Sequence, residues 1–89
     1  MKSKSPLASL RNVGPATLKD LEILGITSLE QLAHANPTEL YQRLQKITAT
    51  KHDPCVWDVF AAIIHEAKTG QKTNWFEWTS LRKKTSINN

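Results

Sequence analysis

The placement of proline constrains the fold of this 89-residue chain more than any other feature. Each of the four prolines opens a segment whose apolar residues have helical spacing. Proline is tolerated at the first helical position because the N–H that it lacks would have no partner there. A capping residue stands just before three of them, in the pairs Ser5-Pro6, Asn36-Pro37 and Asp53-Pro54. The pattern predicts helices over residues 6–11, 15–24, 37–47 and 54–68.

Further boundary signals complete an all-α pattern. Gly25 and Gly70 stand where a left-handed residue ends a helix. Thr27 and Glu30 have the spacing of a capping box, which predicts a short helix with Leu29 and Leu32 facing inward. Helix 37–47 carries one apolar face, formed by Leu40, Leu44 and Ile47 with Tyr41 beside it. Because no segment alternates with period two over a strand's length, the expected fold class is all-α: a compact bundle of about five helices with an aromatic and basic C-terminal tail.

Length and composition fit one ordinary folded domain. Apolar residues make up 39% and charged residues 22%, which excludes a disordered chain. No apolar run approaches the about 20 residues that span a bilayer, and no signal peptide is recognisable. The single cysteine, Cys55, cannot form an internal disulfide, which agrees with a reducing compartment. We expect a cytoplasmic protein with a flexible N-terminus (1–5), a helical domain (6–70), an aromatic docking segment (71–79) and a basic flexible tail (80–89).

The charge is unevenly distributed along the chain. The net charge is +4, yet residues 1–19 carry only basic charges, residues 20–66 are acidic in sum, and residues 67–89 are again basic. Two interpretations stay open. The basic ends are either arms that approach an anionic partner or solvated tails.

The short break Asn12-Val13-Gly14 precedes Pro15 and the helix that it opens. Gly14 can adopt a positive φ, and the new helix directs its free N–H groups and the positive end of its dipole toward the break. This arrangement suits a phosphate. The candidate donors are the backbone N–H groups of Val13, Gly14, Ala16 and Thr17, together with the Thr17 hydroxyl.

The stretch "LRNVGPATLKDLEILGI" resembles the helix-hairpin-helix motif of DNA-binding proteins that lack sequence preference. The resemblance implies that the hairpin backbone holds a DNA phosphate. Asn12 stands where the first hairpin glycine is usual, and Asn tolerates a left-handed φ. Ala16 stands where a lysine is usual, so Lys19 or Arg11 would have to replace that charge. The candidate phosphate-binding set is Arg11, Asn12, Val13, Gly14, Ala16, Thr17 and Lys19.

A wider resemblance covers residues 7–79. The stretches "LYQRLQKIT", "HDPCVWDVFAAIIHEAKTG" and "NWFEWT" are similar to a small bacterial family described as pathogenicity-locus proteins, some of them labelled mitomycin-resistance proteins. The resemblance implies a single helix-hairpin-helix domain. The label implies a DNA-damage or stress context.

No cluster predicts catalysis, a metal or a cofactor. His52 and Cys55 supply only two ligands, and His65 lies nearly three helical turns, about 15 Å, from Cys55. Cys55 is expected to be a small buried residue, although a helix N-terminus could lower its thiol pKa. Tyr41, Asp58 and Glu66 are expected on the helix surface or at its edge, and no nucleophile, base and orienting group cluster. We therefore expect no enzyme activity.

Helix 54–68 carries two apolar stripes and should be central. Val56, Val59, Phe60 and Ile63 form the first. The second, Trp57, Ala61 and Ile64, needs a cover, which is either the tail through Trp75, Phe76 and Trp78 or a second subunit. The same tail, with Arg82, Lys83 and Lys84, could instead form a nucleic-acid surface.

The sequence thus predicts weak DNA binding without sequence preference. The positive charges of Arg11, Lys19, Lys2 and Lys4 would surround the phosphate site. The alternative is a protein-interaction adaptor in which the hairpin is structural, with a protein partner or a homodimer. No membrane and no small-molecule substrate are expected.

Overall fold

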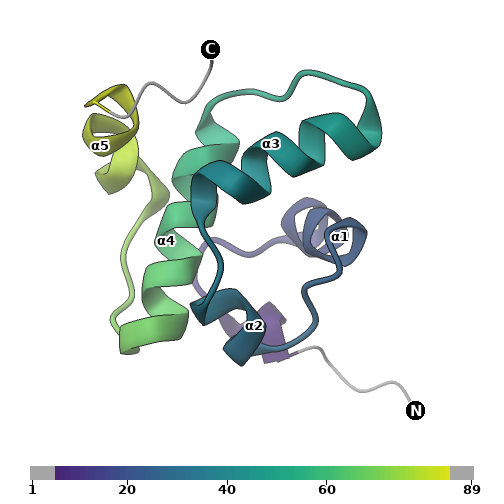
Figure 1. The fold of residues 1–89 in the computed structure, drawn as a ribbon. Helices are drawn as coiled ribbons and strands as arrows, with labels where there is room; N and C mark the ends of the chain where they lie inside the picture. Colours follow the sequence, from purple (N-terminus) through teal and green to yellow (C-terminus); the bar gives the residue numbers. More distant parts are fainter. Residues whose placement is uncertain (1–5, 85–89) are drawn as a thin grey trace.

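The computed structural model describes residues 6–84 and confirms the all-α fold class. The order of elements is a 3-10 helix η1 (Pro6–Ser9), α1 (Pro15–Ile23), α2 (Leu29–Ala33), α3 (Pro37–Thr48), α4 (Cys55–Thr69), a 3-10 helix η2 (Trp75–Trp78) and α5 (Thr79–Lys84). Figure 1 shows this arrangement. Across these residues the structure contains no strand. Lys2, Lys4, Ser5 and the segments 1–5 and 85–89 lie outside the described residues.

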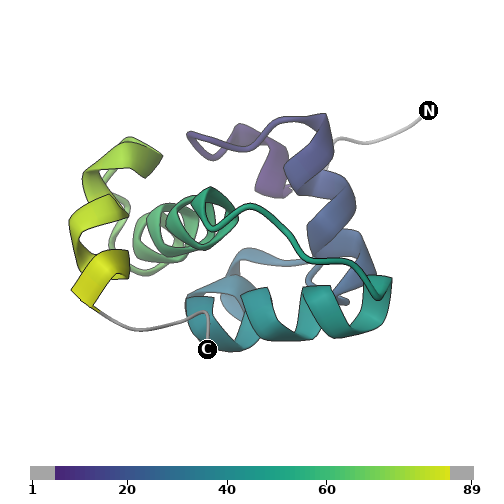
Figure 2. The same cartoon turned by 90° about the horizontal axis from the view of Figure 1, so that it is seen from above.

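Helix α4 is the centre of the molecule, as its two apolar stripes predict. Helices α2, α3 and η2 all pack against it. Helices α1 and α5 lie on opposite sides of it (Figure 2). Phe60 and Ile63 are fully buried in the middle of α4, and they meet Leu21 of α1, Leu32 of α2 and Leu44 of α3 in one hydrophobic core. The core therefore joins elements from both halves of the chain.

Local capping signals place most helix boundaries correctly. Gly25 adopts φ +80°, and the Ile26 N–H donates to Leu21 O while the Gly25 N–H donates to Glu22 O, the two hydrogen bonds of a Schellman stop. Asn36 Oδ1 accepts the Glu39 N–H at 3.1 Å and caps α3. Gly70, also with φ +80°, ends α4.

Three local expectations were wrong. Residues 6–11 form only the four-residue η1, followed by bends and turns. The capping box of α2 uses Ser28 and Gln31 in place of Thr27 and Glu30, because Ser28 Oγ accepts the Gln31 N–H at 3.1 Å. Leu29 does not face inward and Ile47 leaves the buried face of α3: their side chains are exposed by 40% and 53%.

Three polar residues expected at the surface are buried instead. Asp58, Glu66 and Tyr41 are exposed by 0%, 7% and 2%. Each has a partner. The Tyr41 hydroxyl donates to His52 O at 2.7 Å, and the two carboxylates accept hydrogen bonds from the C-terminal part of the chain. The periodicity of α4 marks its apolar faces but carries no information about which polar side chains a later segment covers.

The C-terminal part turns back along α4 (Figure 1). The basic flexible tail expected from residue 80 begins instead as α5, which extends to Lys84. Asp58 holds this helix, because Oδ1 accepts from Arg82 Nε at 2.8 Å and Oδ2 accepts from the Thr79 hydroxyl at 2.8 Å. A buried carboxylate with charged and neutral donors is fully satisfied, so α5 is anchored to the core. Within residues 6–84, no helix combines the length and the apolar character that a membrane crossing requires.

Candidate functional site

The turn between η1 and α1 spans Leu10–Gly14 and is the first part of the candidate site. Asn12 takes the left-handed conformation, with φ 74°, as the sequence predicts for an asparagine at this position. Gly14 does not use its conformational freedom: its φ is −110° and its ψ is −174°, which is extended backbone that any residue adopts. Asn12 therefore makes the sharp bend, and Gly14 serves as the N-cap position of α1.

A distant segment fixes the conformation of this turn. The Asn12 side chain makes two hydrogen bonds to the 73–75 segment: Nδ2 donates to Thr73 O at 2.7 Å, and Oδ1 accepts the Trp75 N–H at 3.2 Å. Arg11 adds a third, from Nε to Asn74 Oδ1 at 2.7 Å. Figure 2 shows the loop between η1 and α1 extending toward η2. The turn is thus built from residues more than 60 positions apart.

Glu66 of α4 also stabilises this turn. Its Oε1 accepts the Arg11 backbone N–H at 2.9 Å, and its Oε2 pairs with Lys72 Nζ at 2.7 Å. A carboxylate that is 7% exposed thereby connects the turn to the start of the C-terminal part of the chain. The sequence places Asn12 in the phosphate-binding set and predicts its tolerance of a left-handed φ, but it does not predict the two hydrogen bonds of its side chain or the roles of Glu66 and Asn74. No local pattern pairs residues that lie so far apart.

Three of the four expected backbone donors have no hydrogen-bond acceptor within the described residues. The fourth, the Val13 N–H, donates to Leu10 O at 3.3 Å and is therefore not available to a ligand. Among residues 6–84, the N–H groups of Gly14, Ala16 and Thr17 have no acceptor, and Pro15 has no N–H. The Thr17 hydroxyl likewise has no partner in the described part of the chain, and Lys19 is exposed on the same helix. Free N–H groups at the N-terminus of a nine-residue helix can hold an anion.

The expected docking residues divide into two groups. Trp57, Ala61 and Ile64 are buried within the chain, and the Trp57 indole donates to Thr38 Oγ1 at 2.9 Å. Of the three tail aromatics, only Trp78 packs on the core: it lies over α4 with its ring 5.2 Å from that of His65. Trp75 and Phe76 remain partly exposed.

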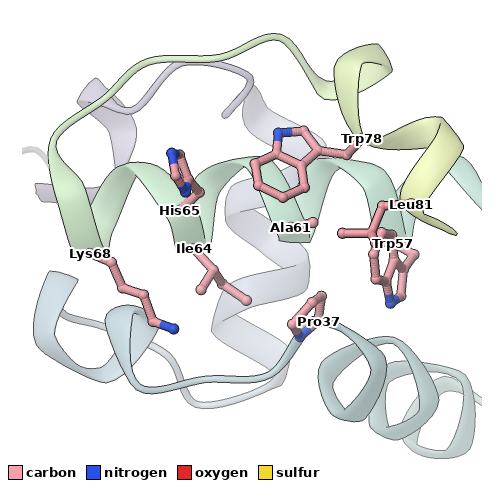
Figure 3. Close-up of a pocket in the computed structure, with 8 residues that line it drawn as sticks. All are labelled: Pro37, Trp57, Ala61, Ile64, His65, Lys68, Trp78 and Leu81. Atoms are coloured by element: carbon pink, nitrogen blue, oxygen red, sulfur yellow. The ribbon is translucent and has the colours of Figure 1, made fainter. Parts of the chain in front are cut away.

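A groove runs along α4 between Trp78 and Pro37, the first residue of α3 (Figure 3). Its volume is about 280 Å³, and it is lined by Pro37, Trp57, Ala61, Ile64, His65, Lys68, Trp78 and Leu81. The figure shows the Trp78 ring above Ala61 and beside His65, with Pro37 across the groove. The second stripe of α4 is therefore largely covered by the chain itself, and this groove stays open along it.

Cys55 is half-buried and not fully buried as expected, and its thiol is not activated. Burial raises its pKa above the ordinary value, and the hydrogen bond and negative charge of Asp53 raise it further. Asp53 Oδ1 accepts the Cys55 N–H at 2.8 Å, and this bond lowers the pKa of the Asp53 carboxyl. The helix N-terminus therefore does not activate the thiol. The His52 ring is hydrogen-bonded to Thr48 and the His65 ring to Gln71. Between residues 6 and 84, no group of three potential metal ligands occurs.

The site belongs to a small all-α domain whose N-terminal turn and C-terminal segment are joined. The chain is a member of the pathogenicity locus family, whose model matches residues 2–84. It is 32% identical over 80 residues to the mitomycin resistance protein McrB of Streptomyces lavendulae, a match that covers 90% of this chain and 76% of that protein. No solved structure matches the chain significantly.

Proposed function

We propose that the protein binds DNA without sequence preference, with η1, the Leu10–Gly14 turn and α1 acting as a helix-hairpin-helix. One observation carries the proposal. The N–H groups of Gly14, Ala16 and Thr17 have no acceptor in the described chain, while the turn beside them is held rigid by Glu66 and the 73–75 segment. Preorganised donors bind an anion without first having to be ordered.

The chemistry of these donors determines what kind of recognition is possible. Backbone N–H groups contact phosphate oxygens and not base edges, so they position DNA without reading its sequence. The Thr17 hydroxyl adds a donor, and Arg11 and Lys19 add positive charge at the exposed surface. One turn neutralises one or two phosphates, so useful affinity requires a second site, a second copy or a partner.

The family fits this proposal at the level of context. The name of the Streptomyces relative refers to mitomycin resistance, and we propose a DNA-damage or stress setting for this chain. We propose that the protein binds DNA in the cytoplasm and catalyses no reaction.

Substitution of Gly14 tests the proposal directly. Its backbone is extended, and a Cβ built there meets no atom within 4 Å, so a side chain can start at this position without backbone strain or a clash at Cβ. Gly14→Glu places a carboxylate beside the three donors, and Gly14→Gln adds the same volume without the charge. Anisotropy of a labelled duplex should show wild-type binding that weakens with a log–log salt slope of about −1 to −2.

The two variants give opposite expectations. Gly14→Glu should lose most of the binding, and Gly14→Gln should retain most of it, provided that circular dichroism shows both to be folded. If the wild type does not bind at low salt, or if Gly14→Glu binds as the wild type does, the proposal is wrong.

The groove in Figure 3 supports a second candidate, a protein-interaction adaptor. Its walls are apolar apart from His65 and Lys68, and it stays open after the tail has packed. In this alternative the turn is structural. A protein partner that co-purifies with the wild type and with Gly14→Glu, but not with a folded Leu81→Arg variant, would favour the adaptor. Leu81 lines the groove and is 45% exposed, so the new charge alters the groove wall and not the core.

A further inference from the structure

Two aromatic side chains are exposed next to the candidate phosphate site. Trp75 and Phe76, here called the aromatic pair, are exposed by 37% and 59%. Their rings are 5.8 Å apart and nearly perpendicular, at 82°. The third aromatic residue of the same 3-10 helix, Trp78, instead packs on α4. The exposure is therefore specific to the aromatic pair and is not a general property of η2.

The aromatic pair is physically joined to the turn. The Trp75 N–H donates to Asn12 Oδ1, and the preceding residue, Asn74, accepts from Arg11 Nε. Gly14, the first residue with a free N–H, is two positions beyond Asn12, so their Cα atoms are at most about 7 Å apart. A nucleotide whose phosphate contacts these donors would hold its base within reach of the Trp75 ring.

We infer that the aromatic pair stacks on unpaired bases, so that the protein prefers single-stranded or locally unpaired DNA to intact duplex. This inference rests on the proposed function and specifies its substrate class. Aromatic rings stack on bases of any sequence, because every base has a π-face. A base inside a duplex is already stacked on both sides and offers no face to a surface ring, whereas an unpaired base does.

The geometry of the pair matches a flexible strand. The rings meet edge to face, so a base stacked on one ring cannot continue its stack onto the other, and the bases of a flexible strand can turn to suit each ring. The exposed Arg11 side chain donates to Asn74, the residue before the pair, and its guanidinium can also meet a phosphate. Glu77 is the acidic residue nearest to the pair in sequence, and its Oε2 is occupied by the Asn74 N–H at 2.9 Å.

The test compares two labelled probes, an oligothymidylate of about 12 nucleotides and a blunt-ended duplex annealed from two strands, by anisotropy at low salt. The double variant Trp75→Ala/Phe76→Ala removes both rings and leaves the backbone hydrogen bond to Asn12 in place. Trp75→Tyr/Phe76→Tyr keeps two aromatic faces. Ile47→Ala is the matched control, since this side chain is 53% exposed on α3.

The wild type should bind the single strand more tightly than the duplex. The alanine double variant should weaken single-strand binding at least about fivefold and change duplex binding by less than about twofold. The tyrosine variant should retain most of the single-strand affinity, and Ile47→Ala should change neither. Quenching of tryptophan emission by the oligothymidylate should be strongly reduced in the tyrosine variant, because of the two remaining tryptophans Trp57 is buried and Trp78 packs on α4.

The outcomes separate the inference from the proposed function. If the alanine double variant binds the single strand as the wild type does, the inference is wrong. The proposed function then still stands if Gly14→Glu abolishes binding. If single-strand binding needs the aromatic pair but tolerates Gly14→Glu, the turn is not the phosphate site, and the base-stacking role of the pair still stands. If neither probe binds to the wild type, both are wrong.

Discussion

Glu66 and Arg11 are 55 positions apart in the sequence, yet the Glu66 carboxylate accepts the Arg11 backbone N–H at 2.9 Å. The other oxygen of the same carboxylate pairs with Lys72. One nearly buried acidic side chain of α4 therefore fixes both the beginning of the turn and the beginning of the C-terminal part. Whatever the turn binds, its shape depends on this residue.

Glu66→Ala should destabilise the protein by about 2–3 kcal/mol, because it removes a charge-assisted hydrogen bond and an ion pair that is largely buried on the Glu66 side. Glu66→Gln keeps an oxygen acceptor for the Arg11 N–H and should cost less. Urea denaturation measures both costs. Hydrogen exchange of the Arg11 amide should accelerate in the alanine variant and remain slow in the glutamine variant. Equal exchange rates in the two variants would contradict the role given to the carboxylate.

Arg82→Ala should destabilise the protein by about 3 kcal/mol, because it leaves the fully buried Asp58 carboxylate with only the Thr79 hydroxyl as a donor. Lys83→Ala is the matched control, because Lys83 is the exposed neighbour and should change stability by less than about 0.5 kcal/mol. Chemical denaturation of the three proteins gives the comparison. A similar small effect of both substitutions would show that α5 contributes little to the fold.

Alkylation of Cys55 should follow a midpoint above the ordinary thiol pKa, because burial and Asp53 both disfavour the thiolate. The neutral thiol is the form that the fold favours. Its stabilising contribution is present below the unfolded-state pKa and is lost as the pH rises through the folded-state value. Asp53→Asn keeps an oxygen for the Cys55 N–H, removes the negative charge and should lower the midpoint. Iodoacetamide rates measured against pH by mass spectrometry test both statements, and a wild-type midpoint below that of free cysteine would refute them.

Ala16→Lys should tighten DNA binding, because it restores a positive charge at an exposed position beside the free donors of α1. The log–log salt slope should become steeper by up to about 0.9, the value for one further neutralised phosphate. Gln42→Lys adds the same charge at an exposed position on α3 and should have a smaller effect. If the two lysine variants bind equally, total charge and not the turn determines the affinity.

The sequence predicts those parts of the fold that depend on neighbouring residues. Gly25 and Gly70 end helices and Asn36 caps one, because each acts on backbone groups within a few positions. Periodicity likewise identified α4 as the central helix. Leu29 and Ile47 show the limit of this reasoning, since helical spacing determines a face but not whether another element covers it.

The candidate site was predictable only in part. The turn and its left-handed Asn12 follow from local backbone preferences. The partners of Asn12 and Arg11 do not, because Glu66, Thr73 and Asn74 meet them only after the C-terminal part has folded back along α4. The fold of the C-terminal part also decides that Trp78 packs on α4 while Trp75 and Phe76 stay exposed. The sequence alone predicts the same docking role for all three aromatic residues.

The hydrogen bonds between Asn12 and the 73–75 segment also set an order of events during synthesis. Helices α1 to α3 contribute to one core centred on α4, so they acquire their packing only once residues 55–69 have been made. The turn cannot be completed at that stage, because its partners are 61 and 63 positions further along the chain. The Leu10–Gly14 turn therefore reaches its final shape only after residues 73–75 have become available to it.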